Sequence, residues 1–131
     1  MTRSESREQA FIIIFESQFN KESIEEIIAL AGEIRDVKIS SFAKTLIASA
    51  NYNSEKINEI ISQYAKKWSL NRISKVSLSV LQLAIGEILT ESDVPVGVTI
   101  NEAVELCKKY GGEDDFSFVN GILGAYSKTL N

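Results

Sequence analysis

Apolar residues recur every three or four positions along most of the chain, and this spacing predicts a succession of α-helices. No stretch shows the strict alternation that is typical of a strand. Four helices are expected in the first half, at residues 2–19, 20–32, 39–50 and 53–68. Asn20 is expected to cap the second of these helices, which ends at Gly32 or, alternatively, at Ile34. Thr2 and Glu5 have the spacing of a capping box at the start of the first helix.

Three further helices are expected in the second half. Residues 73–89 are almost entirely apolar, which predicts a central helix with little solvent-facing surface. Thr99 and Glu102 fit a capping box at the start of the next helix, and the glycines at 111–112 are expected to end it by entering the left-handed conformation. The last helix is expected to begin at residues 114–115, because carboxylates suit a helix N-terminus.

The predicted fold is all-α, a compact bundle of six to eight helices in two halves. One domain is expected over residues 1–131, with an N-terminal half of about 1–68 and a C-terminal half of about 69–131. In the last helix, Gly121 and Gly124 each weaken helix formation by roughly 1 kcal/mol relative to alanine. We therefore expect another helix to approach that helix closely at these two positions.

Composition narrows the classes of function. The chain has 131 residues, a net charge of −4 and no histidine. Histidine is the usual general base and the commonest metal ligand, so we expect no enzyme, no metal site and no cofactor. The single Cys107, the polar N-terminus and the absence of a long apolar run indicate a cytoplasmic protein. The negative net charge does not attract nucleic acid, so RNA binding would need a local patch, a partner or base stacking.

Several side chains carry candidate binding chemistry, and each also has a purely structural interpretation. Phe116 and Phe118 flank a helix start beside Lys108. One ring is expected to enter the core, and the other, if exposed, would stack on an unpaired base. The acidic run 113–115 is more typical of a helix cap than of a metal cluster, and Cys107 of a small buried residue than of a nucleophile. From the residues alone, helix packing is the favoured interpretation of the aromatic pair, and the chain is a helical binding module.

Short sequence blocks in a fixed order cover nearly the whole chain. They read S-R-E-Q-A-F-I-I-I-F near the N-terminus, then W-S-L-N-R-I-S-K-V and L-Q-L-A-I-G-E-I-L, and finally I-N-E-A-V-E-L-C-K-K-Y-G and F-V-N-G-I-L. Their order and spacing together resemble the NusB family of bacterial transcription antitermination factors. The resemblance implies an all-α protein that binds single-stranded boxA-type RNA as a heterodimer with NusE, a small-subunit ribosomal protein. It further implies a role in helping RNA polymerase to read through terminators.

The resemblance also implies which residues meet RNA. The arginine-rich N-terminus of the family corresponds to Arg3 and Arg7 here, which are expected to contact phosphates. The aromatic residue of the F-V-N-G block corresponds to Phe118, which is expected to stack on a base. Lys108 matches the lysine of the E-L-x-K block and is expected to contact a phosphate, and Asp114 matches an acidic position in the turn before the last helix.

Some positions depart from the family pattern. The two N-terminal arginines are interleaved with two glutamates, so RNA affinity without a partner is expected to be weak. Ser77 and Leu78 stand in place of an acidic–arginine pair, Gln82 in place of an arginine, and Gly86 in place of a bulky residue. Ser77, Leu78 and Gln82 are the candidate partner-binding residues, and they predict a less charged contact with NusE. Leu78 also supports an alternative, a homodimeric interaction module of the same fold with little or no RNA binding.

Overall fold

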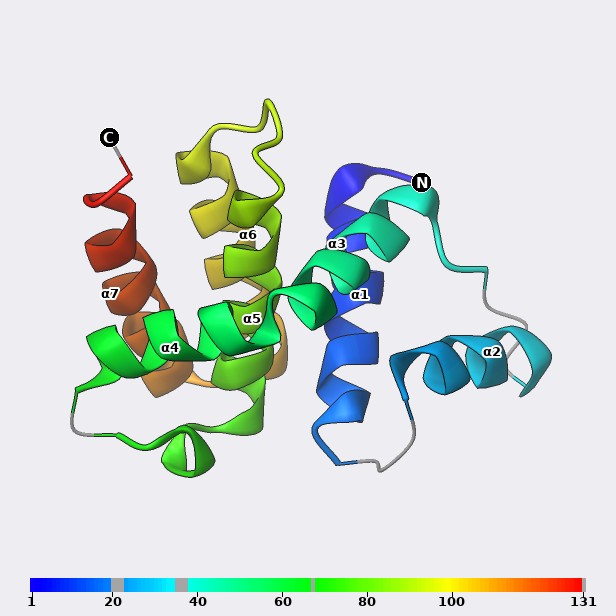
Figure 1. Cartoon of the computed structure of the whole chain (residues 1–131), viewed down its shortest axis with the longest axis horizontal. Coiled ribbons are helices and arrows are strands. Elements are labelled where there is room, and N and C mark those ends of the chain that lie inside the picture. The colour runs from blue at the N-terminus through cyan, green and yellow to red at the C-terminus, as the bar shows by residue number, and fades with distance from the viewer. Residues whose placement is uncertain (20–22, 35–37, 67, 131) are drawn as a thin grey trace.

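The structure, a computed structural model, describes residues 1–19, 23–34, 38–66 and 68–130. Within these ranges the chain forms seven α-helices, one short 3-10 helix and no strand (Figure 1). The prediction of an all-α bundle of six to eight helices is therefore confirmed. The elements are α1 (Arg3–Ser17), α2 (Ile24–Ile34), α3 (Ser41–Tyr52), α4 (Ser54–Ala65), η1 (Leu70–Arg72), α5 (Lys75–Leu89), α6 (Val96–Tyr110) and α7 (Glu113–Ser127).

The helix around which the others are arranged is α5. It contacts α1, α3, α4, α6 and α7, and in Figure 1 it lies between α1 on one side and α7 on the other. From Ser77 to Glu87 every residue except Gln82 is buried. An almost uninterrupted apolar sequence produces this arrangement, because a helix without a polar face has to be covered on all sides.

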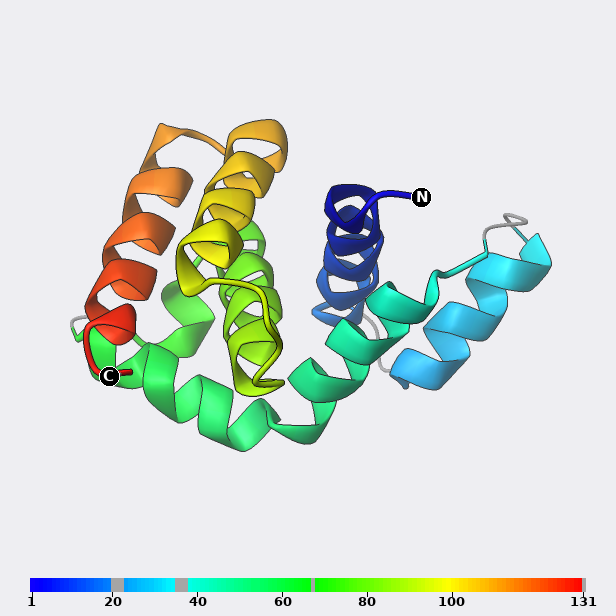
Figure 2. The ribbon, with the colours of Figure 1, turned by 90° about the horizontal axis from the view of Figure 1, so that it is seen from above.

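At the N-terminal side of the fold, α1 packs against α3 and α5 and carries α2 on its outer side (Figure 2). The predicted capping box at its start is confirmed. The Thr2 hydroxyl accepts the Glu5 N–H at 3.0 Å, and the Glu5 carboxylate accepts the Thr2 N–H at 2.9 Å. Both bonds satisfy N–H groups that have no partner inside the helix.

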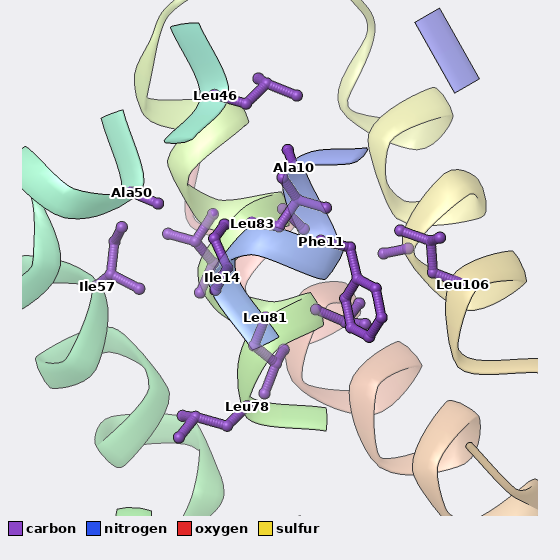
Figure 3. Packing of buried hydrophobic residues seen from close by; sticks show 14 of the residues in the cluster. Ala10, Phe11, Ile14, Leu46, Ala50, Ile57, Leu78, Leu81, Leu83 and Leu106 are labelled. Atoms are coloured by element: carbon purple, nitrogen blue, oxygen red, sulfur yellow. The ribbon is translucent and has the colours of Figure 1, made fainter. Parts of the chain in front are cut away.

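One hydrophobic cluster joins the helices. Figure 3 shows side chains from α1, α3, α4, α5 and α6 that meet in it, among them Ala10, Phe11, Ile14, Leu46, Ala50, Ile57, Leu78, Leu81, Leu83 and Leu106. The last helix adds the predicted stripe of Val119, Ile122, Leu123 and Tyr126, all of which are buried. Because α4 packs against α5 and α7, it joins the helices of the second half to the chain before them. A division of the domain near residue 68 stays a prediction.

The structure confirms the alternative end of one predicted helix and shows that the predicted end of another is wrong. The second helix continues past Gly32 to Ile34, the alternative end, and its predicted cap, Asn20, lies outside the described residues. The fourth helix ends at Ala65, because Lys66 takes a positive φ of 52° that breaks the helical path. Trp68 therefore lies beyond the helix, just before η1, and its side chain is exposed.

The predicted capping box of Thr99 and Glu102 is also wrong, because α6 begins three residues earlier, at Val96, directly after Pro95. Thr99 is thus inside the helix, and its side chain is buried. Its hydroxyl donates to the Glu87 carboxylate at 3.2 Å. A hydroxyl that donates to a carboxylate forms a stronger hydrogen bond than one between two neutral groups.

The glycine that permits a close helix crossing is not the one that the sequence suggested. A Cβ atom added to Gly121 or Gly124 would meet no atom within 4 Å, so the expected close approach at these positions is wrong. At Gly86 of α5, a Cβ atom would lie 3.2 Å from the Cα and N atoms of Ala50 in α3. The Ser49 hydroxyl, one residue earlier, donates to the Gly86 carbonyl at 2.7 Å. Gly86 is where α3 and α5 come together.

Candidate nucleic-acid interface

Arg7, one of the expected phosphate contacts, is inside the protein. Its residue is 4% exposed, and its guanidinium forms a bidentate pair with Glu87, with Nε–Oε1 and Nη2–Oε2 distances of 2.8 and 2.7 Å. A third contact runs from Nη1 to Glu102 at 3.4 Å. The pair with Glu87 joins α1 to α5, and the contact with Glu102 joins α1 to α6. Hydrogen bonding to the Glu87 carboxylate raises the pKa of Arg7. This geometry contradicts a phosphate contact by Arg7, because all three guanidinium nitrogens face carboxylates of the same chain.

Arg3 is in a different environment, on the exposed face of the first turn of α1. Its guanidinium carbon lies 4.8 Å from the centre of the Phe42 ring, a cation–π contact that fixes the side chain over α3. It lines an open surface pocket of about 400 Å³ together with Asp93 and Pro95. The guanidinium is accessible there, so Arg3 remains a candidate for a phosphate contact.

The turn between α6 and α7 is held by one carboxylate. The two glycines end α6 as predicted, although with φ of −120° and −123° rather than in the left-handed conformation. Asp115 Oδ2 accepts the Gly112 N–H at 2.9 Å, and Oδ1 accepts the hydroxyls of Ser74, the N-cap of α5, and of Ser77 within α5. A Cβ atom on Gly111 would lie 2.6 Å from this carboxylate, so any other residue there would have to displace the Asp115 side chain. Burial of Asp115 opposes its ionisation, but the hydrogen bonds outweigh burial and lower its pKa.

Beside this turn is an apolar pocket of about 310 Å³, which we call the Trp68–Phe118 pocket. Trp68, Arg72 and Ile73 line it from the segment around η1, and Phe118 and Asp114 line it from α7. The Trp68 side chain is 51% exposed and that of Phe118 is half-buried. Two aromatic side chains from separate elements thus border one surface pocket, with a guanidinium at its edge.

Trp68 and Arg72 were not among the residues expected to bind RNA. The W-x-x-x-R block contains both residues and was the one sequence signal that could have pointed to them. The sequence pattern, however, placed Trp68 at the end of a helix and indicated no residue that it would contact. Only the fold brings this segment beside α7, because Ser74 and Ser77 are tied to Asp115.

Lys108 and Phe116 lie in another groove, between α6 and α7. The Lys108 ammonium is 5.7 Å from the centre of the Phe116 ring and 3.4 Å from the Glu105 carboxylate. Both aromatics flanking the helix start are half-buried, so the expectation that one of them enters the core is wrong, and each ring is partly accessible. Apart from the buried Arg7, the residues expected to bind RNA lie in three separate places, with Arg3 on α1, Lys108 on α6, and Phe118 in the Trp68–Phe118 pocket.

The candidate partner-binding residues of α5 are mostly inaccessible. Ser77 and Leu78 are 1% and 6% exposed, and Ser77 donates to Asp115. A direct partner contact by these two residues is contradicted, because helices of the same chain already cover them. Gln82 is half-buried and is held by amide hydrogen bonds to Gln18 and Asn58, at 2.7 and 3.2 Å. The burial of Leu78 also removes one of the two observations that favoured a homodimeric interaction module, the other being the sparse positive charge of the N-terminus.

The described part of the chain contains no cluster of side chains that could hold a metal ion. No group of three or more histidine, cysteine or acidic side chains there is arranged to hold a metal ion. Cys107 is fully buried, and burial raises the pKa of its thiol to about 12, far from that of a reactive thiolate. None of the described helices combines the length and the apolar character needed to cross a membrane.

An all-α fold that presents aromatic and basic side chains in open surface pockets is typical of a helical nucleic-acid-binding protein. The NusB family model matches residues 4–128, and the chain belongs to the NusB family.

Members of this family with a similar length resemble the chain over nearly its whole sequence. The transcription antitermination protein NusB of Natranaerobius thermophilus is 37% identical over 136 residues, covering 100% of this chain and 98% of that protein. That of Clostridium acetobutylicum is 40% identical over 126 residues, covering 95% and 93%. The solved structure of T. maritima NusB has a TM-score of 0.86 at 38% identity, covering 98% of this chain and 92% of that one. A NusB chain solved with NusE and double-stranded RNA has a TM-score of 0.85 at 29% identity, covering 99% and 100%.

Proposed function

We propose that this protein is a transcription antitermination factor that binds boxA-type RNA together with NusE and supports RNA polymerase in reading through terminators. The observation that carries the proposal is the near full-length similarity to antitermination proteins, combined with the match to a NusB chain solved with NusE and RNA. The protein acts in the cytoplasm as a binding subunit and performs no catalysis.

The Trp68–Phe118 pocket is the proposed contact for an unpaired base. Stacking of a base on an aromatic side chain contributes about 1–3 kcal/mol and tolerates different sequences. Phe118 and Trp68 both line the pocket, and Arg72 adds a planar cation that suits either a base or a phosphate. Arg3 and Lys108 supply accessible phosphate contacts outside the pocket.

NusE is required because the positive residues of this chain are outnumbered by its acidic ones. The net charge is −4, and Arg7 is neutralised inside the protein by Glu87. Few phosphate contacts release few counterions, so binding by the isolated chain is weak and a basic partner has to complete the surface.

The test is fluorescence anisotropy of a labelled boxA-type RNA, with this protein alone and mixed with NusE, at two salt concentrations. We expect tight, salt-sensitive binding only in the mixture. Trp68 is the single tryptophan of the chain, so its fluorescence should be quenched when a base stacks in the pocket. Phe118→Leu should weaken binding, whereas Phe118→Tyr, which keeps an aromatic ring, should retain it. No binding by the folded protein with or without NusE would refute the proposal.

A further inference from the structure

A second groove lies between α6 and α7, and it shares no lining residue with the Trp68–Phe118 pocket. Its volume is about 300 Å³, which is at the lower end of the range for small-ligand sites. Phe116 lines this groove and Phe118 lines the pocket. Two positions along a helix correspond to a rotation of about 200°, so the two rings point to different sides of α7.

The phenyl ring of Phe116 is accessible from the groove and is only loosely covered. The Lys108 ammonium above it is held by the ring at 5.7 Å and by Glu105 at 3.4 Å. The side chains of Lys108 and Glu105 are 51% and 67% exposed, so water screens their attraction. A ligand can therefore displace the ammonium from the ring without breaking a buried interaction, and the ammonium remains within reach of an anionic group on that ligand.

The rim of the groove carries polar side chains whose hydrogen-bonding groups are accessible. The side chains of Asn101, Ser117 and Asn120 line it, and none of them forms a hydrogen bond with any residue that the structure describes. Amide and hydroxyl groups of this kind both donate and accept hydrogen bonds, which suits the mixed edge of a nucleobase.

We propose that this groove, formed by Phe116, Lys108, Asn101, Ser117 and Asn120, binds one unpaired nucleotide of the RNA, in addition to the base in the Trp68–Phe118 pocket. The base stacks on Phe116, the asparagine and serine side chains bond its edge, and Lys108 moves to a neighbouring phosphate. A planar base with a polar edge and one negative charge matches this lining better than an apolar peptide segment does. The inference rests on the proposed function, since it adds a contact to the same RNA.

The charges around the groove limit it to a single phosphate contact. Glu105 lies in the groove, and the acidic run Glu113–Asp115 begins the helix that carries Phe116. These carboxylates repel a continuous phosphate backbone. The strand should therefore touch this site with one nucleotide, and Lys108 should account for about one ion-pair contribution to the salt dependence.

The experiment measures the affinity of the complex with NusE for a labelled boxA-type RNA. Phe116→Leu removes the aromatic face and should weaken binding roughly 5- to 150-fold, which corresponds to the loss of one stacked base. Phe116→Tyr is the matched control and should retain affinity. Lys108→Gln should lower the slope of log affinity against log salt by about 0.7. Affinity of Phe116→Leu within twofold of the unsubstituted complex would overturn the inference.

Phe116 is half-buried, so a variant at an exposed position is also needed. Asn120 is exposed, and Asn120→Asp places a negative charge beside the proposed nucleotide. Reduced affinity of this variant would support the site, and unchanged affinity would overturn it. Reduced binding of NusE with unchanged RNA affinity would instead identify the groove as a protein contact and overturn the inference. If the unsubstituted complex does not bind RNA at all, the proposed function itself fails, whereas binding without an effect at Phe116 refutes only the second site.

Discussion

The buried ion pair between Arg7 and Glu87 gives the sharpest prediction about this fold. Both side chains are almost completely covered, at 5% and 2% exposed, and two hydrogen bonds of 2.8 and 2.7 Å join them. Thr99 adds a third donor to the Glu87 carboxylate. Arg7→Met removes one partner and leaves an almost completely buried carboxylate without its counter-charge.

The size of the effect follows from this burial. Removing one member of a buried pair costs about 3–5 kcal/mol, because the remaining charge is desolvated and uncompensated. For a chain of 131 residues, each kcal/mol lowers the melting temperature by roughly 3–4 °C, so Arg7→Met should lower it by about 10–20 °C. The double variant Arg7→Met/Glu87→Leu removes both charges and should be much more stable than either single variant, close to the unsubstituted protein.

Urea unfolding followed by circular dichroism measures these differences, and a double-mutant cycle isolates the coupling between the two residues. Glu102→Gln is the matched control, since Glu102 is partly exposed and touches Arg7 at 3.4 Å. It should cost no more than about 1 kcal/mol. The folded double variant also tests the function of Arg7, and in complex with NusE it should bind boxA-type RNA as the unsubstituted chain does.

Two results would refute this reasoning. A cost below about 1 kcal/mol for Arg7→Met would mean that solvent reaches the guanidinium, contrary to its burial. A strong loss of RNA affinity in the stable double variant would restore Arg7 as a phosphate contact.

Three further predictions concern single positions. Gly86→Ala should destabilise the protein by up to about 2 kcal/mol, because its Cβ would press on the Ala50 backbone. Gly121→Ala lies in open space on an exposed helix face and should stabilise the protein by about 1 kcal/mol. Thermal melts of the two variants measure the difference. Cys107 should not react with iodoacetamide at about pH 8 until urea unfolds the chain, because its thiol is buried with a pKa of about 12; mass spectrometry measures the labelling. The pKa of Asp115 lies below its ordinary value of 3.8, so its contribution to stability is complete above that value and is lost as the pH falls through the folded pKa. Asp115→Asn should therefore be less stable near neutral pH, and its urea midpoint should fall less between about pH 5 and pH 2.

Each of these predictions has an outcome that would contradict it. Stabilisation by Gly86→Ala would show that α3 can retreat from α5 without cost. Rapid labelling of Cys107 in the native protein would show that the core opens often. A urea midpoint of Asp115→Asn that follows the same pH dependence as the unsubstituted chain would show that the hydrogen bonds to this carboxylate do not favour its ionised form.

The sequence predicted those features that depend on residues near one another in the chain. Apolar spacing identified the helices, and the capping box of Thr2 and Glu5 marked one helix start correctly. The apolar run of α5 predicted its central position, and the two glycines at 111–112 located the turn before α7. These signals are local because helix hydrogen bonds join residues four positions apart. The order of the sequence blocks also led to the correct family.

The tertiary structure alone decided which of the candidate residues are available. Arg7 has the sequence context of a surface arginine, but its partner Glu87 lies 80 positions away, so no local pattern marks it as buried. Gly86 and Gly121 look alike in the sequence, and only the position of α3 distinguishes them. Trp68 and Phe118, 50 positions apart, share a pocket because hydrogen bonds from α5 to Asp115 hold the α6–α7 turn beside them. Helical periodicity determines which face of a helix is apolar, whereas contacts between distant segments determine which polar and aromatic side chains remain accessible.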